Sequence, residues 1–300
     1  MEPPAAAANA AVRPHWWGTL LYVPLLYLMG WLVARPLALL APNWRSNQVD
    51  LAGLIVALIL LLTSLPLRLR RVWQESNPWL RLGLAVPGAL ALRSGVRGLL
   101  KALLLLALVA AGLMLAGQAR WLGELNGALL LNGLLLLAGV GFAEELLFRG
   151  WLWGELELQL GARRALVVQA LIFALLHPWY RAPGLEALGL LGGLILLGLV
   201  LALQRRADAG SLWGAIGLHG GLVGGWFLVQ KGLLQISPAA PGWLVGPGGA
   251  DINPIGGLIG WISLSALLWI RRRWWSKEGS SGSLLAGRCS QGFAPLHWGM

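Results

Sequence analysis

Charged residues are scarce in this sequence of 300 residues. They make up 12% of the chain, whereas hydrophobic residues make up 57%, and a soluble globular protein carries about 25% charged residues. So little charge cannot cover a globule in water, which excludes an ordinary soluble protein. The apolar residues also form long, nearly uncharged runs, and a run of about 18 residues matches the thickness of a bilayer core. The sequence therefore predicts an integral membrane protein that crosses the bilayer several times.

Acidic residues and cysteine are also few. The chain has 12 Asp and Glu against 23 Lys and Arg, an excess that would suit nucleic acid. However, the basic residues lie in short clusters between the apolar runs, as the positive-inside rule places them on the cytoplasmic side of a membrane. We therefore expect membrane lipid, and no nucleic acid, as a partner. The single cysteine, Cys289, excludes an intramolecular disulfide, and its place in a polar tail argues against a catalytic role.

The apolar runs predict an all-α, polytopic transmembrane helix bundle of about eight spans. With the N-terminus in the cytoplasm, the basic clusters after the second, fourth, sixth and eighth runs all fall on the cytoplasmic side, which supports this count. The runs cover about residues 17–41, 50–67, 98–117, 126–150, 162–178, 185–203, 212–230 and 254–270.

A single transmembrane domain is expected between two disordered ends. Residues 1–15 are rich in Ala and Pro, and the tail 276–300 is rich in Gly and Ser, a composition typical of unstructured segments. The transmembrane domain would cover residues 16–275.

Ionisable residues inside the apolar runs are functional candidates, because charge is costly in a hydrocarbon layer. The fourth run contains Glu144, Glu145 and Arg149. Glu145 and Arg149 are four residues apart, so they share a helix face and can form an ion pair. Glu144 points about 100° away and is left to face a cavity, where a carboxylate can act as a general base on water. The alternative is an interfacial ion pair with no catalytic role.

Two of the four histidines lie within or at the edge of later runs. His177 ends the fifth run and His219 lies in the seventh, whereas His15 and His297 lie near the chain ends. A lone histidine in a membrane helix is often only a packing residue. Two histidines with a Glu-Glu-Arg set supply a base, an orienting group and a donor for a developing oxyanion. These are the parts of a site that activates water for hydrolysis.

The order and spacing of these motifs resemble those of the CAAX protease and bacteriocin-processing family, also called CPBP or Abi. The resemblance covers roughly residues 120–270. It implies an all-helical intramembrane endopeptidase acting on a peptide or protein substrate, and the type members of the family remove the last three residues of prenylated proteins. The matching residues are Glu144, Glu145 and Arg149 in the first motif, Phe173 and His177 in the second, and His219 in the third.

The resemblance also implies a role for each residue. Glu144 would activate the attacking water with the help of His177, and His219 would contribute to the oxyanion site. In the metalloprotease interpretation of the family, these three residues would instead bind a divalent metal such as zinc with a water in the open position. The sequence lacks the His-Glu-x-x-His helix that makes a zinc assignment firm, so both alternatives stay open. Supporting roles fall to Glu145, Arg149 and Phe173.

One position departs from the family pattern. The third motif usually carries Asn or Asp four residues after its histidine, and this chain has Val223. Losing an oxyanion donor typically costs several kcal/mol of transition-state stabilisation, and Gln169 and Asn132 are candidates to replace it. Two further interpretations stay open, the first of them supported by Val223 and the second by Glu144 and the histidines. One is a non-catalytic membrane protein of the same fold with an immunity or scaffold role, and the other is a transporter that relays protons or binds a cation.

The predicted topology places two motif residues toward opposite sides of the membrane. Glu144 lies late in the fourth run, near the cytoplasm, while His177 ends the fifth run on the far side. At about 1.5 Å per residue, these positions lie too far apart to cooperate. Either the run boundaries shift, or residues 150–161 continue the fourth helix and place Glu144 deeper.

Overall fold

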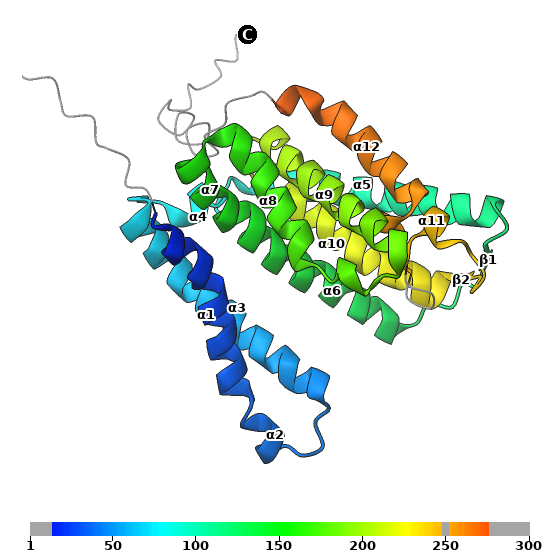
Figure 1. The fold of residues 1–300 in the computed structure, drawn as a ribbon, viewed down its shortest axis with the longest axis horizontal. Helices are drawn as coiled ribbons and strands as arrows, with labels where there is room; N and C mark the ends of the chain where they lie inside the picture. Colours follow the sequence, from blue (N-terminus) through cyan, green and yellow to red (C-terminus); the bar gives the residue numbers. More distant parts are fainter. Residues whose placement is uncertain (1–13, 248–251, 276–300) are drawn as a thin grey trace, which may run out of the picture. The chain divides into compact units, whose positions relative to one another are not determined.

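The computed structural model describes residues 14–247 and 252–275. The disorder expected at the two ends of the chain falls almost entirely on residues outside these ranges, as does Cys289, and stays a prediction. The described residues form helices and two short strands, which confirms the predicted all-α bundle (Figure 1).

A helix occupies each of the eight apolar runs. Stretches rich in Leu, Ala and Val form helices in lipid because every backbone hydrogen bond is then made within the segment. The long helices are α1 (Trp16–Ala34), α3 (Ser46–Val72), α5 (Gly88–Leu115), α6 (Gly127–Glu145), α8 (Ala162–Leu176), α9 (Gly184–Ala207), α10 (Trp213–Leu228) and α12 (Leu258–Arg271). The short elements are α2 (Leu37–Leu40), α4 (Pro78–Arg81), α7 (Trp153–Leu160), α11 (Gly242–Val245) and the antiparallel pair β1 (Ala119–Trp121) and β2 (Leu234–Ile236).

Five helices of the described part are long and apolar enough to cross a bilayer, so the chain is an integral, multi-pass membrane protein. The count of eight spans is not confirmed, because α8 and α12 have 15 and 14 residues, fewer than the roughly 20 that a span needs. The 16 residues of α10 reach that length only together with the π-helical turn η3 (Val229–Leu233). The five segments are Trp16–Leu40, Ser46–Val72, Gly88–Leu115, Gly127–Leu160 and Gly184–Ala207.

The chain divides into two compact units, residues 1–79 and 80–300, and the expected transmembrane domain covers parts of both. In the first unit, α1 and α3 pack against each other as an antiparallel pair of helices. A Cβ atom on Gly30 would lie 2.4 Å from the Gly53 carbonyl oxygen, so the absence of a side chain is what allows this approach.

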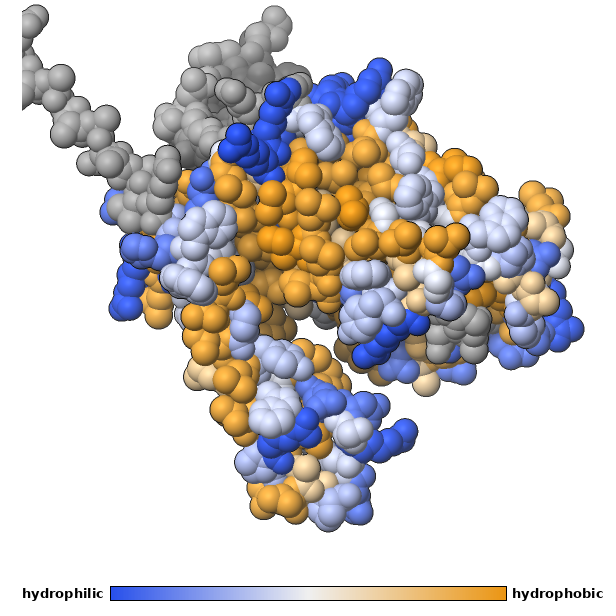
Figure 2. Space-filling model, in the orientation of Figure 1, coloured by the Kyte–Doolittle hydropathy of each residue, from blue (hydrophilic) through white to orange (hydrophobic). Residues whose placement is uncertain are grey.

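The centre of the second unit is α10, which packs against α5 and α6 (Figure 1). Glycines form this contact: a Cβ on Gly220 would lie 2.2 Å from the Leu137 oxygen, and one on Gly224 would lie 2.2 Å from the Gly133 oxygen. Helices that touch backbone to backbone hold their polar side chains at fixed separations. Figure 2 shows broad hydrophobic areas on the visible face of this unit, as expected of a surface that contacts lipid.

The fourth apolar run is longer than the sequence indicated. It continues from α6 through a π-helical turn, η1 (Leu146–Leu152), into α7, and the whole segment Gly127–Leu160 has 34 residues. The boundary expected at residue 150 is therefore wrong, and the alternative, in which the residues after 150 continue the fourth helix, is confirmed as far as Leu160. Glu144 lies near the middle of this segment, which removes the conflict with His177 at the end of α8.

Candidate active site

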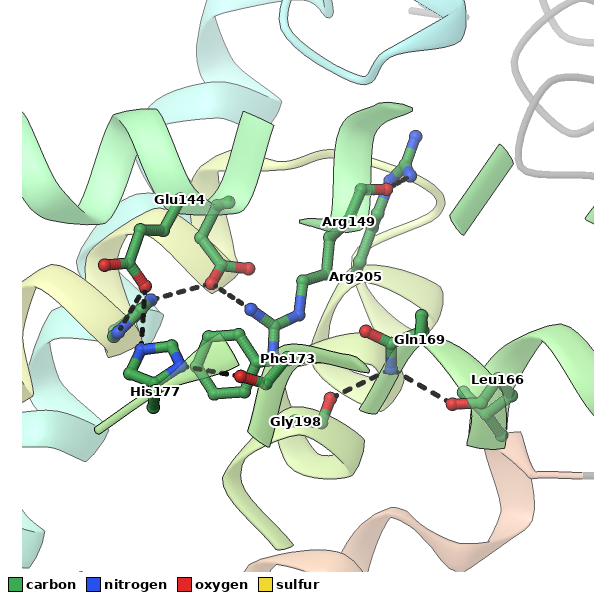
Figure 3. A network of polar contacts seen from close by, with 10 residues as sticks. Glu144, Arg149, Leu166, Gln169, Phe173, His177, Gly198 and Arg205 are labelled. Carbon is green, nitrogen blue, oxygen red and sulfur yellow. Dashed lines mark hydrogen bonds and ion pairs between the residues drawn. The ribbon is translucent and has the colours of Figure 1, made fainter. Parts of the chain in front are cut away.

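The six site residues expected from the sequence lie together in the second unit. Glu144 and Glu145 end α6, Arg149 lies in η1, Phe173 and His177 end α8, and His219 lies in α10. Both glutamates directly precede the π-helical turn, a local widening of the helix that is frequent at functional sites. Figure 3 shows four of these side chains, Glu144, Arg149, Phe173 and His177, lying close together.

Glu145 joins two of its neighbours. Its Oε1 accepts a hydrogen bond from Arg149 Nη1 at 2.8 Å, and the same oxygen lies 2.8 Å from His219 Nδ1. The side chains of Glu145 and Arg149 are fully buried, and that of His219 is 4% exposed. The spacing of the sequence predicted the ion pair with Arg149, but it gave no indication of the contact with His219.

Glu144 faces both histidines. Its Oε2 lies 3.4 Å from His177 Nε2 and 3.8 Å from His219 Nε2. The Glu144 side chain is 30% exposed, in contrast to the fully buried Glu145. The two adjacent carboxylates therefore occupy different surroundings: Glu145 is enclosed by an ion pair, whereas Glu144 has a partly exposed side chain whose Oε2 atom is buried without a hydrogen-bond partner.

The hydrogen bonds of the histidines define which ring nitrogen carries a proton. His177 Nδ1 lies 2.6 Å from the Phe173 carbonyl oxygen, which can only accept, so Nδ1 is the donor. Likewise, Glu145 accepts from His219 Nδ1. In each neutral ring the Nε2 atom then carries a lone pair. Both lone pairs face the Glu144 carboxylate, so three acceptors converge on a place suited to a proton or a water molecule.

Phe173 packs at the centre of the site and is fully buried. Its ring centroid lies 4.3 Å from that of His177 and 5.8 Å from that of His219. The Arg149 guanidinium carbon lies 4.1 Å from the same centroid. One aromatic ring thus contacts three of the polar side chains and restricts their rotamers. Phe148, which sequence reasoning missed, meets Phe173 edge to face at 5.0 Å; its aromatic side chain next to Arg149 was the available signal.

Arg205 is a second residue that sequence reasoning missed. It counted only as part of a basic cluster after the sixth run, yet its side chain is buried. Its guanidinium donates to the carbonyl of Arg149 (Figure 3), and to the carbonyls of Arg81 at 3.0 Å and Gly210 at 3.1 Å. Arg205 thereby ties the π-helical turn to α9 and to the segment before α5.

Neither proposed replacement for the missing donor at Val223 contacts His219. Gln169 is buried, and its amide nitrogen donates to the carbonyls of Leu166 at 3.0 Å and Gly198 at 3.2 Å (Figure 3). Gln169 therefore links α8 to α9. Asn132 is exposed on α6. The amide N–H groups of Gln169 are thus committed to backbone carbonyls, and no hydrogen bond joins Asn132 to His219 among the described residues, so neither side chain supplies the donor that Val223 lacks.

A metal site was the alternative use of Glu144, His177 and His219. Within residues 14–247 and 252–275, no group of three or more His, Cys, Asp or Glu side chains is arranged to hold a metal ion. Metal binding by Glu144, His177 and His219 stays a prediction.

Comparison with models of known families matches residues 125–224 to the family described as type II CAAX prenyl endopeptidase Rce1-like. The six site residues all lie within the Rce1-like segment, and the resemblance inferred from the motifs is confirmed. A second family model, a domain of unknown function (DUF8676), matches residues 3–77, almost the whole of the first compact unit. No curated protein and no solved structure matches the chain at a significant level.

Proposed function

We propose that this protein is an intramembrane endopeptidase in which Glu144 activates a water molecule for attack on a peptide bond. The observation that carries the proposal is the convergence of the Glu144 carboxylate and two histidine Nε2 atoms within a multi-pass membrane protein. A part-exposed carboxylate beside two rings of fixed orientation has the geometry of a general base.

The first step is proton removal from water. A water beside the pair of Glu144 Oε2 and His177 Nε2 would donate one hydrogen to each, since both atoms are acceptors. Glu144 takes a proton as the water oxygen attacks the carbonyl carbon of the scissile bond. The same proton then passes to the departing amine, which leaves as the carbon–nitrogen bond breaks. His177 holds the water, and its own orientation is set by its bond to Phe173.

The second requirement is a donor for the oxyanion that forms on the carbonyl oxygen. His219 can donate from Nε2 when its ring is protonated, because Nδ1 is already committed to Glu145. In that state the charges of Glu144, Glu145, Arg149 and His219 add to zero, which suits a buried site. Glu145 is therefore proposed to position His219 and to stabilise its charge.

The substrate proposed from the family is a protein or peptide whose cleavage site enters the membrane, with a prenylated C-terminus as the first candidate. A second function, a non-catalytic role on the same fold, is favoured by one observation. Val223 removes a donor, and neither Gln169 nor Asn132 replaces it. The two functions differ in whether the purified chain hydrolyses any such peptide.

The test is cleavage of a farnesylated, internally quenched CAAX peptide by the full chain in proteoliposomes. We expect Glu144→Gln to lower kcat by about 10²–10⁴-fold, the usual contribution of a general base, with little change in KM. Glu124→Gln, at an exposed position, is the matched control and should cleave like the wild type. Undiminished cleavage by Glu144→Gln would refute the proposed role, and inactivity of the wild type on a panel of prenylated and unmodified peptides would favour the non-catalytic function.

A further inference from the structure

A second group of charged side chains lies where α5, α9 and α12 approach one another. Arg97 and Lys101 come from α5, Gln204 and Asp208 from the end of α9, and Arg271 from the end of α12. We refer to these five residues as the basic cluster. None of them belongs to the site around Glu144.

The cluster holds three cations and one carboxylate. Arg97 pairs with Asp208, whose side chain is fully buried. Lys101 and Arg271 form no ion pair with any carboxylate of the described residues. Both donate instead to the same neutral atom, Oε1 of Gln204, from Lys101 Nζ and from Arg271 Nη2 at 3.4 Å. Two cations thus share an acceptor that carries no charge, which leaves the cluster with a net charge of +2.

The carboxylate is already occupied on both oxygens. Asp208 Oδ1 accepts from Arg97, and Oδ2 accepts from Gln204 Nε2 at 2.6 Å. A Cβ on Gly214 of α10 would overlap Asp208 Oδ2, so α10 closes the inner side of the cluster. Arg97 is 39% exposed, and Lys101 and Arg271 are half-buried. The three cations are therefore partly accessible, whereas the carboxylate of Asp208 is buried.

The cluster lies where three apolar segments end. Almost all residues are uncharged in three stretches next to the cluster: the 14 residues of α5 after Lys101, the part of α9 before Gln204 and the part of α12 before Arg271. In a bilayer this is the level of the lipid headgroups, and basic pockets between helices at that level recruit anionic headgroups. Figure 2 shows hydrophilic side chains gathering beside the hydrophobic surface near the end of α12, where Arg272 and Arg273 are exposed.

We propose that the basic cluster binds the phosphate of an anionic phospholipid, with Lys101 and Arg271 as its main contacts and the acyl chains lying against α5 and α12. Arg and Lys are the side chains that bind phosphate oxygens by charge-assisted hydrogen bonds. A bound phosphate would supply the counter-charge that Gln204 lacks. The site is independent of the chemistry proposed for Glu144.

The experiment measures binding of dioctanoyl phosphatidylglycerol to the full chain in a neutral detergent, with dioctanoyl phosphatidylcholine and inorganic phosphate as the comparison ligands. We expect phosphatidylglycerol to bind at least about fivefold more tightly than phosphatidylcholine. Lys101→Gln and Arg271→Gln should each weaken phosphatidylglycerol binding about fivefold, the effect of one basic residue near a membrane surface. Arg163→Gln removes the same charge from an exposed position at the start of α8 and should leave the affinity unchanged.

Three results would overturn the proposal. Equal affinity for the two lipids would show that the headgroup charge is not recognised. An equal loss with Arg163→Gln would show that only the net charge of the chain matters. Inorganic phosphate that binds as tightly as phosphatidylglycerol would identify the ligand as a free anion instead of a lipid. Lys101→Gln and Arg271→Gln are tested as separate variants, and size-exclusion chromatography of each would detect misfolding.

Discussion

Arg149 and Glu145 form an ion pair in which both side chains are fully buried. Replacing Arg149 with Met keeps most of the side-chain volume but leaves the Glu145 carboxylate without its cation. Removing one partner of a buried pair costs about 3–5 kcal/mol, because the remaining charge is not compensated. The loss of the cation–π contact with Phe173, at 4.1 Å, adds to this cost by about 1 kcal/mol. We therefore expect Arg149→Met to lower the free energy of unfolding by about 4 kcal/mol or more.

The double variant Glu145→Gln/Arg149→Met separates charge from packing. With both charges gone, no unpaired ion stays buried, so we expect it to be at least about 2 kcal/mol more stable than Arg149→Met alone. Its activity should not recover, since His219 Nδ1 then lacks an ionised partner. Stability is measured by denaturant titration in mixed micelles, followed by circular dichroism, and activity by peptide cleavage.

Two outcomes would refute this reasoning. The first is a cost below about 1 kcal/mol for Arg149→Met, which is close to the effect of a surface substitution. The second is a double variant no more stable than the single one. Arg163→Met, at an exposed position, is the control and should change stability by no more than about 0.5 kcal/mol.

Three shorter predictions concern packing, the missing donor and metal dependence. Gly224→Ala should lower the free energy of unfolding by about 1–3 kcal/mol, because the new Cβ would lie 2.2 Å from the Gly133 oxygen. Gly139→Ala is the control: its Cβ meets no atom within 4 Å, so it should be neutral or stabilising in the same unfolding assay. Val223→Asn restores the polar residue of the family pattern and should raise kcat by about tenfold or more; an unchanged or lower kcat would count against an oxyanion site beside His219. Peptide cleavage should survive dialysis against a chelator, and loss of activity that zinc restores would contradict the metal-free steps.

The sequence predicted the residues of the site, but it did not predict all of the contacts that these residues make with other helices. Glu145 and Arg149 are found in contact because spacing along a helix is a local property. The contact between Glu145 and His219 could not be predicted, since it depends on how closely α10 approaches α6. That approach is set by Gly220 and Gly224, whose missing side chains let the backbones of α10 and α6 touch.

The extent of the fourth helix was misjudged for a related reason. Polar residues after residue 150 looked like the end of a span, yet Glu155 accepts from Trp151 at 3.0 Å, and Glu157 lies 3.8 Å from Arg206. A neighbouring indole on the same helix satisfies Glu155, and Arg206 of α9 compensates the charge of Glu157, so the helix continues to Leu160. Arg205 was misread in the same way, because burial of a cation against backbone carbonyls leaves no trace in the sequence.

The central claim, direct attack of a water activated by Glu144, is tested by a single turnover in ¹⁸O-labelled water with enzyme in excess over substrate. Mass spectrometry then locates the label in the released peptide and in the enzyme. The account predicts one ¹⁸O atom in the new C-terminal carboxylate of the product and none in Glu144. Label in the Glu144 carboxylate with an unlabelled product would indicate a covalent intermediate on this residue and would contradict the account, as would label-bearing product formed at the same rate by Glu144→Gln.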